Sequence, residues 1–351
     1  MLIYFNAYRI VPSRSLLSVL AVVVLLFNAG CGLFGAKKKI TVPQLLGPLA
    51  KADKSQLIQE VNRLSTVKSI HAKVDIQFED TSFASAGIAD QYRLVDGMIT
   101  LQRPSQIYLI IQFTFVDIAQ MASDGEHFRV AVLQGNDKYK RFVKGTNSAD
   151  YGKFDADGNG ATAQQTAQQK TEKITVSALS NLRPQHLTDA FMIRPIESNN
   201  SLVYAQSEFF NEEPDTRRQA KKDARVMRGY YFLDEFSTAA PGDAKLMRRF
   251  WFDRVGGIRL ARVQSYDERG QLITDVSYSN EKALGSGPTA SLPSRVEITR
   301  PQDQYKLSIS YQDSASVELN RDYPPRAFVL ENKWGLPEVD LDAQNKKAAN
   351  K

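Results

Sequence analysis

The residue types that could carry out chemistry in this chain are few and widely spaced. His71, His127 and His186 are its only histidines, and they form neither an HExxH pair nor a His/Cys cluster, so the pattern argues against a catalytic zinc. The sequence contains no Gly-x-Ser-x-Gly elbow and no Walker-type phosphate loop, and its carboxylates are scattered. We therefore expect a protein that is not an enzyme and needs no cofactor.

One acidic stretch has part of a metal-binding pattern. Residues 155–160 (DADGNG) place oxygen-bearing side chains and a glycine as in the first half of a calcium-binding loop. The last ligand position of such a loop normally holds a bidentate glutamate, and here it holds Thr166. We expect a flexible acidic turn and no metal.

The single cysteine, Cys31, occupies the most informative position. Arg9 and Arg14 precede an apolar run from Ser15 to Phe27, and the small pair Ala29-Gly30 stands directly before the thiol. The arrangement resembles a bacterial lipoprotein signal peptide, although Asn28 stands where such signals usually have leucine. The resemblance predicts a signal peptide over 1–30 and lipid modification of Cys31, with an acyl group such as palmitate.

Two alternatives to lipoprotein processing remain. The apolar run fits a signal peptide, which needs roughly 7–15 apolar residues, better than a membrane-spanning helix, which needs about 20. A retained short anchor and ordinary secretion with a free cysteine are the alternatives. If Cys31 carries a diacyl group and its amine is acylated as well, three acyl chains insert into the membrane. Two lipid signals already suffice for stable anchoring, so the chain would be held there. Gly32, in place of the aspartate that retains many lipoproteins in the inner membrane, favours the outer membrane facing the periplasm.

Composition excludes other classes of protein. The 351 residues carry a formal charge of +6 that is spread along the chain, so nucleic acid is not an expected partner. Arg248-Arg249-Phe250-Trp251-Phe252 mixes basic and aromatic residues, but on a strand these alternate between two faces. With one cysteine no intramolecular disulfide can form, so a hydrophobic core must hold the fold.

Hydrophobic periodicity predicts mostly strands. Lys54 to Thr66 has the spacing of an amphipathic helix, and Ile70 to Glu79 then alternates with period two. Ile107, Leu109, Ile111, Phe113 and Phe115 stand on one face of another expected strand. A second helix is expected over Ser177 to Ala190, with Pro184 either starting a second segment or kinking the first.

These elements predict a mainly β (α+β) fold: a large curved antiparallel sheet, or unclosed β-barrel, of about 10–12 strands with helices packed on it. The expected organisation is a lipidated tether over 31–53, a half-barrel domain over 54–331 with insertion loops at 145–173 and 212–225, and a disordered tail over 332–351.

The order of elements resembles the LolA/LolB-like lipoprotein-carrier superfamily. The resemblance depends on the Gly-x-(apolar)-x-(apolar)-x-Arg-Pro strand end of Gly97 to Pro104, the hairpin Ser123-Asp124-Gly125, and the later run from Arg248 to Asn280 followed by LPSRVEITRP. It implies an unclosed barrel, capped by helices, whose apolar hollow binds acyl chains without performing chemistry.

That resemblance suggests which side chains would line a hollow. The candidates are Ile107, Leu109, Ile111, Phe113, Phe115, Phe250 and Phe252, and the competing interpretation is that they fill a closed core. The first hypothesis is a membrane-anchored receptor or local-transfer lipoprotein whose cargo is lipid or an acylated protein. The alternative is a structural or sensing lipoprotein that binds another envelope protein through its surface.

Overall fold

The computed structural model describes residues 42–81, 90–91, 94–113, 115–134, 137, 140–149, 151, 182–197, 202–240, 243–284 and 291–349. Contacts divide the chain into Met1–Gln44 and Leu45–Lys351, and the second unit contains a hydrophobic core of its own. Such a unit is expected to fold alone. Cys31, the expected signal peptide and the acidic turn at 155–160 lie outside the described residues, so the expectations about them remain predictions.

The described part is mainly β. Its strands are β1 (Gln44–Leu45), β2 (Ser69–Asp80), β3 (Asp90–Gln91), β4 (Val95–Gln102), β5 (Gln106–Phe113), β6 (Val116–Ser123), β7 (His127–Val132), β8 (Arg141–Thr146), β9 (Leu202–Pro214), β10 (Arg225–Ala240), β11 (Asp243–Asp253), β12 (Arg259–Tyr266), β13 (Leu272–Ala283), β14 (Ser291–Arg300), β15 (Tyr305–Tyr311), β16 (Glu318–Leu319) and β17 (Glu338–Asp340). The helices are α2 (Lys54–Ser65), α4 (Pro184–Phe191) and α5 (Leu341–Ala349), with 3-10 turns η2 (Ser314–Ser316) and η3 (Pro325–Phe328).

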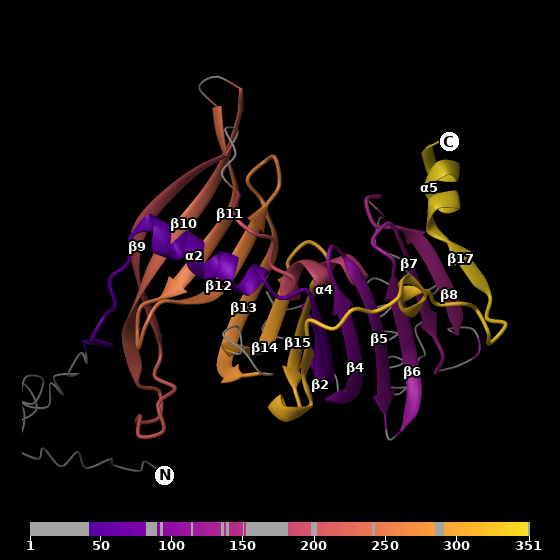
Figure 1. The fold of residues 1–351 in the computed structure, drawn as a ribbon, viewed down its shortest axis with the longest axis horizontal. Coiled ribbons are helices and arrows are strands. Elements are labelled where there is room, and N and C mark those ends of the chain that lie inside the picture. Colours follow the sequence, from indigo (N-terminus) through magenta and orange to yellow (C-terminus); the bar gives the residue numbers. More distant parts are fainter. Residues whose placement is uncertain are drawn as a thin grey trace, which may run out of the picture. The chain divides into compact units, whose positions relative to one another are not determined.

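These strands form one open sheet of 17 strands (Figure 1). Its order runs from β9 through β10, β11, β12, β13, β14 and β15 to β2, then through β4, β5, β6, β7 and β8 to β17. Only the β17–β8 ladder is parallel in the described part, and no ladder there joins β9 to β17. The predicted mainly β fold with an unclosed sheet is confirmed. The sheet has more strands than expected, partly because β1, β3, β16 and β17 are only 2 or 3 residues long.

Helices α2 and α4 cover one face of this sheet, which we call the inner face. The Asp53 side chain accepts from the Gln56 N–H at 2.9 Å and so starts α2, which buries Leu57, Val61 and Leu64. Helix α4 begins at Pro184, a residue that suits the first turn because that turn needs no N–H from it. Helix α2 packs against β12, and α4 packs against β5, β6 and β14.

The Gly97–Pro104 motif has a physical explanation. A Cβ at Gly97 would lie 2.7 Å from Ile76 Cδ1 and 3.0 Å from the Ile110 carbonyl oxygen, so only glycine fits between β2 and β5 without displacing its neighbours. At the other end of the motif, the Arg103 guanidinium donates to carbonyl oxygens of three residues: Val67 at 2.7 Å, Met192 at 3.3 Å and Ile193 at 2.9 Å. Arg103 therefore ties the segment after α2 to the segment after α4.

One expected strand ends earlier than predicted. Strand β5 stops at Phe113, and Phe115 lies in the turn before β6 with φ 69° and 95% of its surface exposed. The prediction that Phe115 shares a face with Ile111 is wrong. The apolar alternation runs through Phe115 without a glycine or proline to mark the reversal, so the pattern concealed the hairpin and also β6.

Two expected loops are shorter than predicted, and part of the expected tether is ordered. Strand β8 extends to Thr146, β9 reaches Pro214 and β10 begins at Arg225, so both loops lose residues to strands, and residues 152–173 lie outside the described part. In the tether, the Leu46 N–H donates to the Met227 carbonyl and the Ala50 N–H to the Arg254 carbonyl, both at 2.8 Å.

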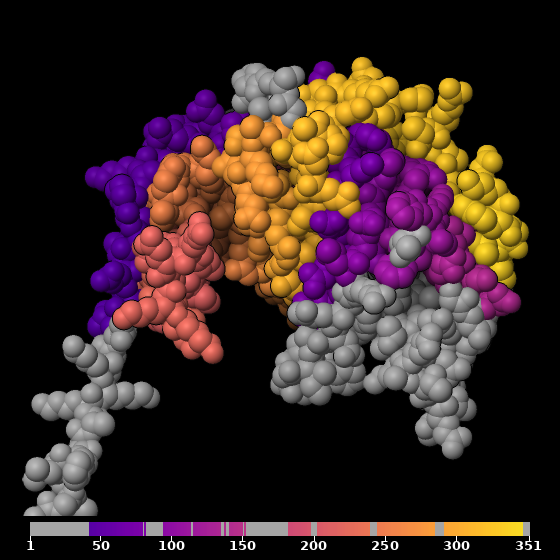
Figure 2. Space-filling model, turned by 90° about the horizontal axis from the view of Figure 1, so that it is seen from below, coloured from indigo at the N-terminus to yellow at the C-terminus, as the bar shows by residue number. Residues whose placement is uncertain are grey.

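The expected disordered tail is ordered through residue 349. Leu330 and the partly buried Trp334 and Leu336 pack against Ala122 and Phe142 on the outer face of the sheet, before the chain continues into β17 and α5. Figure 2 shows this C-terminal segment, in yellow, against the magenta strands. The prediction failed because the apolar residues of the tail follow neither a helical nor a strand period, although they cover an apolar patch.

Candidate functional site

The inner face of β10–β14 is arranged in rungs of side chains that run across the strands. Cross-strand register places Leu233 opposite Phe250, Phe250 opposite Val263, Val263 opposite Val276, and Val276 opposite Ile298. We call these five residues the apolar rung. The neighbouring positions on the same face form a second series, Glu235, Arg248, Ser265 and Thr274, which we call the polar rung.

A cavity of about 400 Å³ lies where these two rungs meet α4. Its volume is in the range of small-molecule pockets, roughly 300–1,000 Å³. Its lining comprises His186, Asp189, Ala190, Ile193, Arg194, Glu235, Met247, Arg248, Val263, Ser265, Tyr266, Ile273, Thr274, Val276, Tyr278 and Arg300. The cavity, which we call the α4 cavity, thus combines an apolar part with a small set of charged groups.

Three contacts hold α4 over this cavity. The buried Tyr278 hydroxyl donates to the Ala190 carbonyl at 2.8 Å, and His186 Nδ1 lies 2.7 Å from the Tyr305 hydroxyl. Arg103 holds the two residues that follow the helix by their carbonyl oxygens, as described above. The roof of the cavity is therefore fixed by side chains from β13, β15 and the turn after β4.

An ion pair in the polar rung faces the cavity. Arg248 donates to both carboxylate oxygens of Glu235, at 2.8 and 2.6 Å, and the Tyr204 hydroxyl donates to the same carboxylate at 2.6 Å. Burial opposes the charge of Glu235, but the bonds and attraction from Arg248 prevail and lower the pKa of that carboxyl. The same pair raises the pKa of Arg248 despite its burial. Both groups are therefore charged at neutral pH.

His186 contributes a neutral group to the same lining. Burial, reinforced by the positive charges of Arg300 and Arg183, lowers the pKa of its imidazole well below the ordinary value. Arg300, another residue of the lining, donates to Thr274 Oγ1 at 2.6 Å and to Asp303 at 2.7 Å. An uncharged imidazole is therefore held among fixed positive charges.

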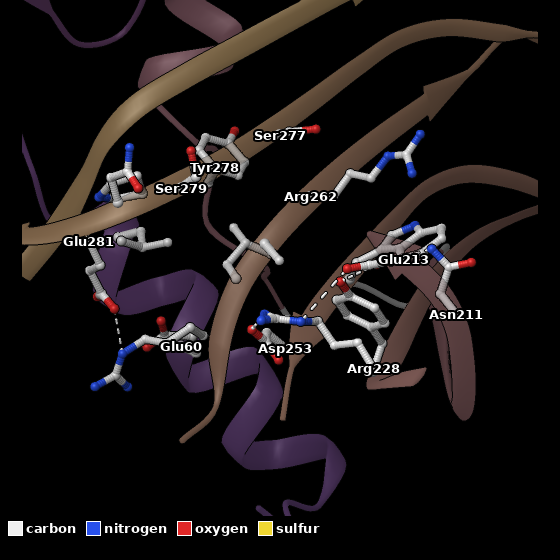
Figure 3. A pocket seen from close by; sticks show the side chains of 18 of the residues that line it. Glu60, Asn211, Glu213, Arg228, Asp253, Arg262, Ser277, Tyr278, Ser279 and Glu281 are labelled. Atoms are coloured by element: carbon white, nitrogen blue, oxygen red, sulfur yellow. Dashed lines mark hydrogen bonds and ion pairs between the residues drawn. The ribbon is translucent and has the colours of Figure 1, made fainter. Parts of the chain in front are cut away.

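A second pocket, of about 440 Å³, is drawn in Figure 3 and has more charged residues in its lining. Its arginines are already paired within the protein: Arg228 bonds Asp253, and Arg63 reaches both Glu60 and Glu281. A third hollow, of about 30 Å³, is apolar and too small for an acyl chain by itself. Tyr278 lines all three.

The expected lining residues divide into three groups. Ile107, Leu109 and Ile111 lie on the inner face of β5, exposed by at most 3%, and pack in the closed core. Phe250 and Phe252 are completely buried on the inner face of β11, where Phe250 belongs to the apolar rung. Phe113 and Phe115 are 41% and 95% exposed at the β5–β6 turn. None of the seven lines the α4 cavity directly, and a role in ligand binding stays a prediction.

The sequence contained a signal for the cavity that the prediction did not use. In β10 Glu235 continues the alternation of Tyr231 and Leu233, and in β11 Arg248 continues that of Phe250 and Phe252. A charged residue in an apolar phase, present on two neighbouring strands, marks a place where the inner face stops being simple core.

Other kinds of site find no support in the described part. No group of three or more His, Cys, Asp or Glu residues there could hold a metal ion. No helix among the described residues combines the length and apolar character needed to cross a bilayer.

Comparisons with known proteins give structures but no sequence relatives. No protein-family model and no curated protein matches the chain. A LolA superfamily protein from Nitrosomonas europaea is 13% identical, and the match covers 80% of this chain and 99% of that one with a TM-score of 0.38. A DUF1329 family protein from Desulfovibrio piger is 10% identical, with coverages of 78% and 95% and a TM-score of 0.37.

A third structure is a putative outer membrane lipoprotein-sorting protein domain from Vibrio parahaemolyticus. It is 11% identical, with coverages of 78% and 94% and a TM-score of 0.37. The superfamily of the Nitrosomonas protein is the one that the Gly97–Pro104 and Ser123–Gly125 motifs resemble.

Proposed function

We propose that this chain is a membrane-anchored cell-envelope lipoprotein that shelters an acyl chain, of a lipid or of an acylated protein, in the α4 cavity. The observation that carries the proposal is the cavity itself, which lies between α4 and the apolar rung and is lined by Ala190, Ile193, Val263 and Val276. Each CH₂ group moved from water into such a lining gains about 0.8 kcal/mol. The proposed role is binding or local transfer of this ligand.

Native mass spectrometry of the chain from Lys37 onward tests this proposal, since that segment contains the whole compact unit. Co-purified phospholipid, or uptake of a fluorescent fatty acid, is the expected result. A matched variant, Val276→Phe, fills the cavity from β13 and is expected to abolish uptake while the protein stays folded. Repeated absence of lipid together with no uptake by the unmodified chain would refute the proposal.

The membrane anchor is a separate part of the proposal and has its own experiment. Cells expressing the full chain are labelled with palmitate, and label is expected in the chain but not in the Cys31→Ser variant. The variant is also expected to leave the outer-membrane fraction. Equal labelling and fractionation of the two proteins would show that Cys31 is not the anchor.

A structural or sensing role is the second candidate, and β9 is the observation that favours it. This strand of 13 residues pairs only with β10 in the described part, and Val203 and Phe210 on it are 50% and 42% exposed. A long edge strand can accept a strand from another protein. Specific capture of an envelope protein that is lost on Val203→Pro, while fatty-acid uptake is absent, would favour this role.

A further inference from the structure

The α4 cavity is polar at one end and apolar at the other, so its lining can fix the orientation of a bound ligand. The polar rung (Glu235, Arg248, Ser265, Thr274) lies two residues along each strand from the apolar rung, which is the next position on the same face. Val263 and Val276 of the apolar rung line the cavity with Tyr278 beyond them, and Arg300 lies beside Thr274. A ligand that matches this lining has a polar head and an apolar tail.

The charges of the lining indicate the sign of that head. Three arginines line the cavity, Arg194, Arg248 and Arg300, against two acidic residues, Asp189 and Glu235. Glu235 is already satisfied by Arg248 and by the Tyr204 hydroxyl, so it has little capacity left for a cationic ligand. Arg194 is 68% exposed and its partner Asp189 lies beside it at the rim. The partner of Arg300, Asp303, is not part of the lining.

The other polar groups of the lining also suit an anion. His186 is neutral because burial and the charges of Arg300 and Arg183 oppose its protonation, and those same charges would favour a bound negative group. The hydroxyls of Ser265 and Thr274 line the wall next to Arg300, and hydroxyls can donate to an anion. Guanidinium groups recognise carboxylate and phosphate through paired, charge-assisted hydrogen bonds.

From this arrangement we propose that the α4 cavity selects anionic amphiphiles, with a carboxylate or phosphate head at Arg194 and Arg300 and the tail along Val263 and Val276 toward Tyr278. The inference rests on the proposed function and adds the charge and the orientation of the ligand. A single charge-assisted hydrogen bond corresponds to roughly a tenfold or greater difference in affinity. Loss of one arginine should therefore be measurable without abolishing binding of the tail.

Calorimetric titration of the chain from Lys37 onward with amphiphiles of one chain length tests the selectivity. Dodecanoate and dodecyl phosphate are expected to bind at least about tenfold more tightly than dodecanol. Inorganic phosphate alone is expected to bind too weakly to detect, because it lacks the tail. Dodecanol or dodecylamine binding as tightly as the anions would overturn the inference and leave the proposed function intact, whereas failure of every amphiphile to bind would refute both.

Single substitutions then test which arginines bind the polar head of the ligand. Arg300→Gln and Arg194→Gln are each expected to weaken dodecanoate binding about tenfold and to leave dodecanol binding unchanged, while Arg300→Lys keeps most of the preference. Arg269→Gln, in the β12–β13 turn outside the cavity, is the matched control and should change neither affinity. Equal weakening of dodecanoate and dodecanol by Arg194→Gln, whose side chain is exposed, would contradict the assignment. Thermal unfolding of each variant identifies any loss that comes from misfolding.

Discussion

The two halves of the sheet use their inner faces differently. On β4–β8 most inward side chains are apolar and tightly packed: Leu109 and Val130 have no exposed surface. Ser123 and Arg141 are buried polar exceptions on this face. On β10–β13 the same face carries an ion pair and opens into the α4 cavity. Helix α4 contacts strands of both halves. In the β10–β13 half of the sheet the hollow lies where the Glu235–Arg248 pair interrupts the apolar alternation.

Breaking the Glu235–Arg248 pair, which only the cavity half contains, should cause the largest change in the free energy of unfolding. Arg248→Met leaves a carboxylate that is 5% exposed without its cation, and removing one partner of a buried pair costs about 3–5 kcal/mol. Urea unfolding is expected to show this loss, and the double variant Glu235→Leu/Arg248→Met is expected to recover most of it. Arg321→Met breaks an exposed pair and should change stability little. Equal effects of the two single variants would mean that the polar rung is not a buried site.

Replacing one inner-face valine by phenylalanine in each half of the sheet tests directly whether only one half contains a cavity. Val130→Phe has no space to occupy and should lower the free energy of unfolding by about 1–3 kcal/mol through overpacking. Val276→Phe can extend into the α4 cavity, so it should cost less stability and should abolish fatty-acid uptake. If Val276→Phe destabilises as much as Val130→Phe, the cavity is filled in solution and the two halves are alike.

The pH dependence of stability distinguishes the halves as well. His186 packs against Tyr305 of β15 and faces Arg300 at the end of β14 and Arg183 before α4, and its pKa is lowered by burial and by those arginines. Below about pH 6.5 the unfolded chain binds a proton at this imidazole that the folded chain does not, so stability falls by up to about 1.4 kcal/mol per pH unit. Above that pH the contribution is fully present.

Urea unfolding between neutral pH and pH 5, a range of about two units, checks this dependence. His186→Asn is expected to flatten it, and His127→Asn is the matched control because the His127 side chain is 55% exposed. An unchanged slope in His186→Asn would show that His186 is not held neutral by the fold.

The smallest change in stability is expected from a substitution in the β5–β6 turn. Phe115 adopts a positive φ and is nearly fully exposed, so Phe115→Gly should leave stability between unchanged and about 1 kcal/mol higher. Fatty-acid affinity should not change, because Phe115 does not line the α4 cavity. Loss of uptake in this variant, measured by the same fluorescent probe, would restore Phe115 to the binding site.

The sequence predicted most of the architecture because alternation and helical period report burial directly. The helix at Lys54–Thr66 and the strands around Ile70–Glu79 and Tyr305–Tyr311 are found with small changes of boundary. The β5–β6 turn was missed because Phe115 keeps the apolar alternation through a reversal, and the order of the tail was missed because Trp334 packs without a period.

The site was harder to predict than the fold. Whether Phe250 lines a hollow or fills a core depends on how far α4 stands from the sheet, and that distance is set by contacts distant in sequence, such as Arg103 to Ile193 and Tyr278 to Ala190. Periodicity identifies which face a side chain occupies and says nothing about what lies opposite. The charged positions Glu235 and Arg248 were the part of the site that a sequence could have indicated.

The most direct test of the account is to locate a bound acyl chain. A fatty acid that carries a diazirine near the end of its tail can be bound to the chain from Lys37 onward, photoactivated, and its adducts mapped by tandem mass spectrometry. We predict adducts on α4 and the residues after it, and on the inward positions of β12 and β13, with a clear decrease in Val276→Phe. Adducts confined to the outer face or to the β5–β6 turn, unaffected by Val276→Phe, would contradict it.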